Sequence, residues 1–381
     1  MPGRVEESRL QPARFVVAVV SAVLLVLSAP FMGEARHWLR ETFPAQFVTI
    51  VGAAVGLAAL IAIAIALSRI RDRRIARYGL VVAAIVLAVT YSARSSIGNA
   101  ESDVVEHVHF IEYGVVTWLF YRAWLPLGDG GVILLPLVAG LAVGTCEEWY
   151  QWFLPARVGE LRDIFLNAAA IVSGLLLSVA MAPPPRFALR ISRRSLSHVF
   201  AVSALLGVLL TGFLNSVHVG YEIADSDVGT FRSIYSAGEL EALARDRVRE
   251  WATNPPVARP PRLSREDQYM SEGLLHVQER NRRWGGGEVT EAWFENRILE
   301  KYFPPVLDTP SYISKTGLRW PSEQRADCER RSSKDSRAFI SHAQGGFPIF
   351  TWPRSAFYTI STVVVCMLAL AAVVTAPRRR R

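Results

Sequence analysis

The sequence predicts an all-α polytopic membrane protein with about eight transmembrane helices and a mainly helical extracytoplasmic domain between helices 7 and 8. Hydrophobic residues make up 51% of the 381 residues, and the mean hydropathy is +0.23. A soluble domain of this length is normally less apolar. The apolar residues also form long runs, and a bilayer core of about 30 Å needs about 20 such residues per helix.

Eight apolar runs account for this prediction. They cover residues 15–32, 46–68, 78–93, 105–124, 131–150, 163–182, 199–214 and 355–376. The first run resembles a signal peptide, because Arg4, Arg9 and Arg14 precede it. It is long, however, and many spans follow, so we expect a membrane anchor. The fourth run carries polar residues near its start.

The positive charge lies in the membrane part of the chain. The formal net charge is +8, but residues 217–352 hold 19 basic and 20 acidic side chains. The excess therefore falls in short arginine clusters between the apolar runs. That pattern is typical of the positive-inside rule and not of a nucleic-acid surface, so we expect no nucleic-acid partner.

The arginine clusters also predict the orientation. The N-terminus, the loops 69–77 and 183–198, and the tail 378–381 are rich in arginine, and the alternate loops are not. With eight spans, all four rich segments fall on one side. We therefore expect a multi-pass membrane protein. Both termini would be cytoplasmic and residues 217–352 extracytoplasmic.

Five parts follow from these spans. They are an N-terminal transmembrane hairpin (1–77), a transmembrane core (78–182), a basic loop with helix 7 (183–216), the extracytoplasmic domain (217–352), and helix 8 with a basic tail (353–381). The extracytoplasmic domain holds only one cysteine, Cys328, so it cannot contain an internal disulfide. It must fold around its own apolar core.

The sequence of the extracytoplasmic domain predicts three helices joined by turns. Ser236-x-x-Glu239 has the pattern of a capping box, which begins a helix. Residues 264–283 and 289–303 predict two further helices, separated by the turn Gly285–Gly287 and ended by Pro304-Pro305. Trp293, Ile298 and Leu299 are expected in the core. Residues 255–261 read as a proline-rich linker.

Polar side chains gather at the ends of the fourth, fifth and sixth spans. On helices, residues three or four apart share a face, and the predicted topology brings these three ends to the outer membrane interface. Ionisable groups at membrane depth are costly and need partners, so we expect three neighbouring helices around one polar pocket. Its residues are His109, Glu112, Tyr113, Glu147, Glu148, Gln151, Arg157, Asp163 and Asn167.

The spacing of these residues is similar to that of a known family. The matching residues are His109-Phe110-Ile111-Glu112-Tyr113, Arg122-Ala123, Glu147-Glu148-Trp149-Tyr150-Gln151, Phe153, Pro155, Arg157, Asp163, Asn167 and Gly174. On these residues, positions 90–174 resemble the VanZ-like membrane proteins, although Glu147 stands where the family has Asp. The resemblance implies a cell-envelope protein whose founding relative is linked to resistance to the glycopeptide teicoplanin. It implies no established reaction.

Three interpretations of the polar residues stay open. Arg157 with Glu148 or Asp163 would form a structural salt bridge that locks the helices. Alternatively, the surplus of acids over Arg157 and Arg162 suggests a site for a cationic ligand or a lipid headgroup. The third interpretation is a catalytic or metal site. The sequence, however, has no His-Glu-x-x-His zinc motif, and no nucleophile is evident beside these residues. The sequence identifies no metal ligand set and no cofactor.

The corresponding functions differ in class. One is an envelope protein that binds a lipid headgroup or a wall precursor and affects glycopeptide susceptibility. Another is a membrane enzyme acting on a lipid-linked substrate. The third is a scaffold that binds an envelope protein through residues 217–352. Membrane lipids are expected partners in each case. Gly52-x-x-x-Gly56 and Gly140-x-x-x-Gly144 predict close helix packing.

Overall fold

The structure, a computed structural model, divides the chain into two compact units. It describes residues 2–96, 98–154, 157, 159–184, 190–256, 268–310, 314–333, 335–343 and 348–377. The first unit consists of Met1–Tyr150, Leu161–Gly212 and Tyr358–Arg381, and we call it the bundle unit. The second consists of Gln151–Glu160 and Phe213–Phe357, and we call it the hairpin unit.

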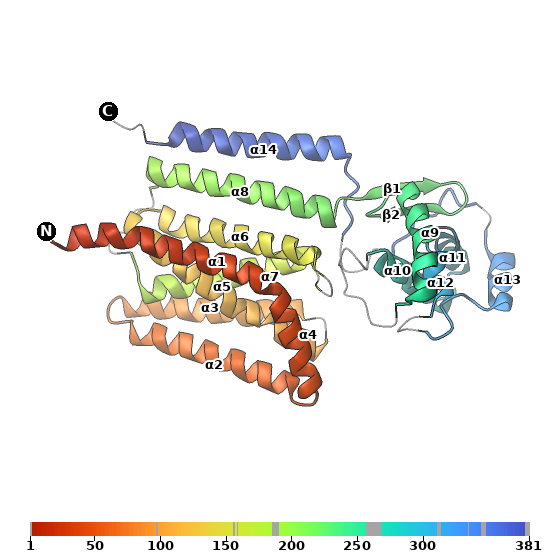
Figure 1. The fold of residues 1–381 in the computed structure, drawn as a ribbon, viewed down its shortest axis with the longest axis horizontal. Coiled ribbons are helices and arrows are strands. Elements are labelled where there is room, and N and C mark those ends of the chain that lie inside the picture. The colour runs from red at the N-terminus through yellow and green to blue at the C-terminus, as the bar shows by residue number, and fades with distance from the viewer. Residues whose placement is uncertain are drawn as a thin grey trace. The chain divides into compact units, whose positions relative to one another are not determined.

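Long helices build the bundle unit (Figure 1). They are α1 (Pro2–Thr42), α2 (Phe47–Ser68), α3 (Arg74–Ser95), α4 (Ala100–Glu106), α5 (Val108–Trp124), the short 3-10 helix η1 (Leu125–Leu127), α6 (Gly131–Trp152), α7 (Leu161–Met181), α8 (Arg193–Val217) and α14 (Arg354–Thr375). Within the described residues, seven of them are long and apolar enough to cross a membrane, namely α1, α2, α3, α6, α7, α8 and α14.

The predicted fourth span is not one continuous helix. Asn99 caps the seven-residue α4 by accepting hydrogen bonds from the amides of Glu101 and Ser102, and α4 ends at Glu106. A turn at His107 then leads into α5, which has 17 residues and is shorter than the seven candidate spans. The break falls near the polar start of the run, and the His107 side chain makes no capping hydrogen bond to α5 there.

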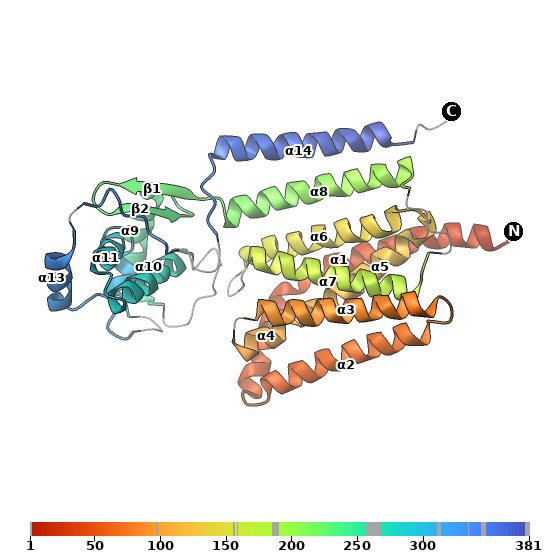
Figure 2. The same cartoon turned by 180° about the vertical axis from the view of Figure 1, so that it is seen from behind.

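Helices α5, α6 and α7 are mutual neighbours, as predicted (Figure 2). A Cβ on Gly174 of α7 would lie only 2.8 Å from the Cα of Gly114 on α5, so these two backbones touch. A Cβ on Gly140 of α6 would lie 3.1 Å from the side chain of Ile171 on α7. This confirms that the Gly140-x-x-x-Gly144 motif packs helices closely. In the other motif, a Cβ on Gly52 would lie 3.5 Å from Val104 of α4, whereas a Cβ on Gly56 would meet no described heavy atom within 4 Å apart from its own stretch of helix.

Among its described residues, the hairpin unit combines five helices with a two-stranded sheet. The helices are α9 (Ala237–Thr253), α10 (Gln268–Gly285), α11 (Val289–Tyr302), α12 (Pro304–Asp308) and α13 (Ser322–Arg331). The antiparallel strands β1 (Tyr221–Asp225) and β2 (Gly229–Ser233) pair Tyr221 with Ser233 and Asp225 with Gly229. Sequence analysis missed this hairpin, because two strands of five residues with polar outer positions give a weak periodic signal.

The predicted helices of this unit are confirmed. Ser236 and Glu239 form the complete capping box at the start of α9. Residues 289–303 match α11, and its predicted core residues Trp293, Ile298 and Leu299 are buried. The helix predicted at 264–283 is described from Gln268 onward, and the predicted linker lies mostly outside the described residues. Pro304 ends α11 but also begins α12.

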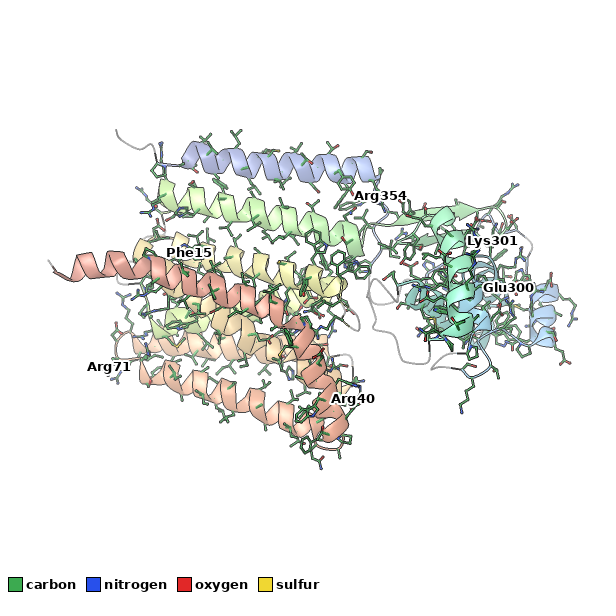
Figure 3. The ribbon with its side chains drawn as sticks, in the orientation of Figure 1. Phe15, Arg40, Arg71, Glu300, Lys301 and Arg354 are labelled. Atoms are coloured by element: carbon green, nitrogen blue, oxygen red, sulfur yellow. The ribbon has the colours of Figure 1, made fainter. Side chains whose placement is uncertain are left out.

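An ion-pair network on α11 ties the hairpin to the helices of this unit (Figure 3). Lys301 donates to Asp225 at 2.7 Å and to Asp227 at 2.9 Å, which are the last residue of β1 and a residue of the turn. Glu300 accepts from Arg325 of α13 at 2.7 Å. The unit therefore has polar cross-links around its apolar core, in place of the disulfide that its single cysteine rules out.

Candidate functional site

Three helices of the bundle unit bring the predicted polar residues together. The first turns of α5 carry His109, Glu112 and Tyr113, and the first turns of α7 carry Asp163 and Asn167. The last turns of α6 carry Glu147 and Glu148, which are 4% and 1% exposed. Helical periodicity places the members of the α5 set on one face and those of the α7 set on another, whereas Glu147 and Glu148 are consecutive residues and are both buried.

Tyr113 and Glu147 join α5 to α6 at the centre of this site. The Tyr113 hydroxyl donates a hydrogen bond to Glu147 Oε2, and both side chains are buried. The ring of His109 stacks on the ring of Tyr113 one helical turn later, with centroids 6.2 Å apart. One carboxylate of the acidic pair therefore has a defined partner from a neighbouring helix.

Asn167 of α7 reaches the same place. The point where a Gly144 side chain would begin lies 3.2 Å from Asn167 Nδ2 and 3.3 Å from the Tyr113 hydroxyl. A side chain at residue 144 would therefore crowd both polar groups, and each would have to shift by a few tenths of an ångström. The glycine predicted to pack helices also makes room for the site.

The Asn167 amide is buried without a hydrogen bond. It is 1% exposed, and within the described chain neither its Oδ1 nor its Nδ2 has a partner. The same holds for the hydroxyl of Thr145, which is fully buried one residue after Gly144, and for the Nδ1 atom of His109. Each such group costs about 1–3 kcal/mol. Unpaired buried polar groups are rare in native proteins, and several in one place call for an explanation.

Arg162 is held by an acid that sequence analysis did not include. Its Nη2 donates to Glu106 of α4 at 2.6 Å and to the backbone carbonyl of Ser95 at the end of α3. This ion pair ties α3, α4 and α7 together beside the site. Glu112 and Asp163 are half-buried on α5 and α7. One of the two arginines expected to offset the acids thus has its own partner.

Gln151 and Arg157 belong to the hairpin unit. Arg157 Nη2 donates to Gln151 Oε1 at 2.8 Å, and Gln151 is 4% exposed. Pairing of Arg157 with Glu148 or Asp163 stays a prediction. Of the nine predicted site residues, the seven in the bundle unit therefore lie on its three neighbouring helices.

Thr145 is the site residue that sequence analysis missed. It lies three residues before Glu148 and so shares its face of α6, and this spacing could have identified it. A lone threonine in an apolar run is usually satisfied by the carbonyl of the preceding turn, as Ser178 is by Gly174. Only the structure shows that the Thr145 hydroxyl lacks such a hydrogen bond within the described chain.

The arrangement offers hydrogen bonds and negative charge in an apolar surrounding. Asn167 can donate and accept, Thr145 can do both, and the Glu147–Glu148 pair attracts donors and cations. No group of three metal-ligating side chains occurs among the residues that the structure describes. The site is therefore suited to a polar, donor-rich ligand.

Comparison with protein-family models, with curated proteins and with solved structures found no match to this chain. The similarity to VanZ-like proteins accordingly stays a prediction that depends on the residues of α5, α6 and α7.

Proposed function

We propose that this chain is a VanZ-like multi-pass protein of the bacterial cytoplasmic membrane. It would bind the polar part of an envelope ligand, a lipid headgroup or a wall precursor, between α5, α6 and α7. The observation that carries the proposal is the buried amide of Asn167, which has no partner in the described chain. A ligand that offers a donor and an acceptor would satisfy both of its atoms.

The chemistry of the ligand follows from the charge of the site. Glu147 and Glu148 are consecutive buried residues at the end of α6, and carboxylates at membrane depth attract hydrogen-bond donors and positive charge. A positively charged amine on the ligand would supply both. An amine-bearing headgroup or an amine-bearing wall precursor therefore fits better than a phosphate alone.

A purely structural role explains the site less well. A brace gains stability by satisfying its polar groups, as Arg162 does with Glu106 and the Ser95 carbonyl. Asn167 and Thr145 add no such bond in the described chain. Replacing them by apolar residues of similar size would cost a brace nothing, so their presence favours binding.

The membrane topology belongs to the same proposal. The 17 residues of α5 span about 25 Å at 1.5 Å per residue, and α4 extends the segment further. Together they can serve as the eighth crossing. Both termini are then cytoplasmic, and residues 217–352 are extracytoplasmic, as the arginine clusters predict.

Cysteine labelling tests this topology. In a chain with Cys146, Cys328 and Cys366 replaced by serine, Ser333→Cys should react with a membrane-impermeant maleimide in intact cells. Arg71→Cys should react only after the cells are permeabilised. The opposite pattern would mean that residues 217–352 are cytoplasmic. The site residues would then not lie at the outer membrane interface.

Susceptibility testing addresses the function. A deletion strain complemented with wild type should differ from the empty strain in teicoplanin susceptibility. Glu148→Gln keeps the shape of the side chain, so it should insert in normal amount yet fail to complement. Glu106→Gln is the control for a purely structural contact. It should lower the amount of protein in the membrane, and activity should fall in proportion to that amount. Full complementation by Glu148→Gln at normal amount would defeat the binding role.

A thermal shift in defined lipid tests the ligand class directly. The purified protein in phosphatidylethanolamine nanodiscs should unfold at a higher temperature than in phosphatidylglycerol nanodiscs, because a bound ligand stabilises the folded state. The Glu148→Gln variant should lose most of that difference. An equal difference in both proteins would show that the amine headgroup does not act through this site.

A further inference from the structure

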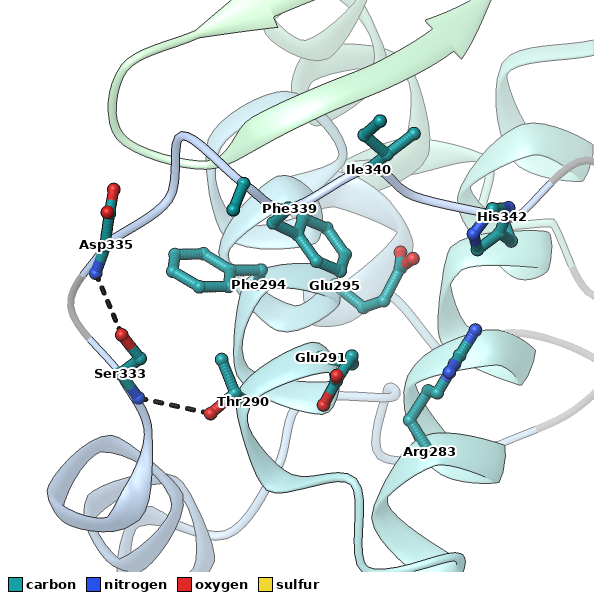
Figure 4. A pocket seen from close by; sticks show the side chains of 11 residues that line it. Arg283, Thr290, Glu291, Phe294, Glu295, Ser333, Asp335, Phe339, Ile340 and His342 are labelled. Carbon is teal, nitrogen blue, oxygen red and sulfur yellow. Dashed lines mark hydrogen bonds between the residues drawn. The ribbon is translucent and has the colours of Figure 1, made fainter.

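The hairpin unit contains a pocket that the proposed function does not use. Its volume is about 560 Å³, and it lies between α11, the end of α10 and residues 333–342 (Figure 4). Polar and charged side chains ring it, and the aromatic rings of Phe294 and Phe339 stack at 5.2 Å within it. It thus offers an apolar contact surface beside groups that can recognise charge.

One wall of the pocket is the exposed edge of a sheet. Residues 338–342, which we call the edge segment, run beside β2: Thr230 donates to the Phe339 carbonyl at 2.9 Å, and Ser341 donates to the Thr230 carbonyl at 2.8 Å. Backbone groups of an extended chain alternate between its two sides. The N–H and C=O of Ile340 therefore point away from β2.

Those two groups of Ile340 are open. Within the described residues neither has a hydrogen-bond partner, and Ile340 is 60% exposed. An unpaired strand edge is a template for another extended chain. Strand addition at such an edge obtains affinity from main-chain hydrogen bonds and specificity from adjacent pockets.

The charge of the pocket identifies which chain fits. Arg283 is already held by Glu279 at 2.7 Å and by Glu288. Glu295 is buried and accepts from Ser341 and His276, each at 2.6 Å. These groups offer little to a ligand.

Glu291 is different. It is half-buried in the pocket wall, and it has no hydrogen bond or ion pair within the described chain. Asp335 adds a second acid at the opposite end of the pocket. The uncompensated charge is therefore negative, and a basic side chain is its complement.

We propose that the edge segment pairs with an extended peptide segment of a partner protein, and that a basic side chain of this peptide reaches Glu291. A second copy of this chain is a poorer occupant, because its own edge would bring Glu291 and Asp335 against the same acids. A small cation is also poorer, because it leaves the donor and acceptor of Ile340 unused. This surface gives the extracytoplasmic side of the protein a docking function that is independent of the bundle site.

Designed peptides test the proposal on the full-length protein in nanodiscs. The probe is a fluorescent, end-blocked hexapeptide Thr-Val-Lys-Val-Thr-Val, whose residues favour strands. Binding is followed by anisotropy. The matched peptide with Glu in place of Lys should bind at least about tenfold more weakly, since a charge-assisted contact is lost. The Lys peptide with alternate N-methylated amides should not bind, because it cannot complete the strand ladder.

Two variants locate the interaction. Ile340→Pro removes the open N–H without removing any hydrogen bond of the folded protein, and it should abolish binding, whereas Ile340→Val should not. Glu291→Gln should erase the preference for Lys over Glu, whereas Glu323→Gln, an exposed acid on α13, should keep it.

Three outcomes would overturn the proposal. One is that no peptide binds at about 1 mM, an upper limit for a useful interaction. Another is that binding survives both the N-methylated backbone and Ile340→Pro. The third is self-association of the protein that Ile340→Pro relieves, which would identify a second copy as the occupant. The peptide experiment does not involve Glu148 or Asn167, so its failure is separate from failure of the bundle site.

Discussion

The two ends of α7 treat buried polar groups in opposite ways. Near the C-terminal end of α7, Arg77 of α3 is 5% exposed. It donates to the carbonyls of Ala180 at 2.7 Å, Met181 at 3.2 Å and Arg69 at 2.9 Å. Near the N-terminal end of α7, about 20 Å away along the helix, the side chain of Asn167 is also buried. Its amide has no hydrogen-bond partner within the described chain.

The satisfied end is built from several such contacts. The Tyr121 hydroxyl donates to the Ala182 carbonyl at 2.6 Å. Asp129 accepts from the Gly131 amide, the Ser192 amide and the Ser195 hydroxyl, so it caps two helices at once. The Arg77 contacts join the ends of α2, α3 and α7, Tyr121 ties α5 to the end of α7, and Asp129 joins the starts of α6 and α8.

The difference separates stability from function. Polar groups that hold a fold together are paired within the chain, because pairing is what offsets the cost of burying them. Polar groups reserved for a ligand stay unpaired until it arrives. If the proposed function holds, binding costs stability at the start of α7 and not at its other end. Variants at both ends of α7 test this difference.

The largest expected effect is at Arg77. Arg77→Ala leaves three carbonyls at helix ends without their donor, and we expect a loss of about 3 kcal/mol in the free energy of unfolding. Arg71→Ala removes the same charge from the exposed loop between α2 and α3 (Figure 3), and it should change stability by less than about 0.5 kcal/mol. Thermal unfolding of the purified variants and their amount in the membrane measure both. Equal behaviour would show that Arg77 only sets topology.

Asp129 should give an intermediate effect with a pH dependence. Burial raises the pKa of its carboxyl, but hydrogen bonds from Ser192, Ser195 and Gly131 outweigh burial and lower it overall. The folded pKa then lies below the unfolded value of about 3.9. The stabilisation is present above that value and is lost as the pH falls through the folded pKa.

Asp129→Asn should therefore cost about 1–2 kcal/mol at pH 7, because an amide nitrogen in place of Oδ2 cannot accept the hydrogen bonds from Ser192 and Ser195. The difference between wild type and variant should shrink on acidification to about pH 3, below the unfolded pKa. Unfolding curves at the two pH values provide the measurement. A gap that stays constant or widens in acid contradicts the assignment of Asp129 as a charged cap.

The smallest effect on stability should occur at the site itself. Asn167→Leu keeps the size of the side chain and removes two buried groups that lack partners, so stability should stay unchanged or rise by about 1 kcal/mol. Complementation of the deletion strain should nevertheless fail. Ser178→Ala, which removes the bond to the Gly174 carbonyl, should show the reverse: a loss of about 0.5–1 kcal/mol and normal activity. Marked destabilisation by Asn167→Leu would make Asn167 part of a brace.

Much of the helical framework could be predicted from the sequence. The apolar runs coincide with α1, α2, α3, α6, α7, α8 and α14 within a few residues at most ends. Longer extensions occur where polar residues continue a helix, as in α1 and at the start of α8. The Ser236 capping box began the expected helix. The common faces of the site residues also followed, because helical hydrogen bonds and periodicity act over only three or four positions.

Tertiary structure decided which polar groups are paired and where the strands lie. Arg77 looked like one arginine of a topology signal, but its acceptors Ala180 and Met181 lie more than 100 positions away. Thr230 likewise pairs with the segment around Ile340 through an isolated bridge, which leaves the N–H and C=O of Ile340 on the outer side. Neither result could be predicted locally. A hydrogen-bond partner or a strand neighbour is chosen by the packing of the whole unit, whereas a helix is specified by the residues within its own turns.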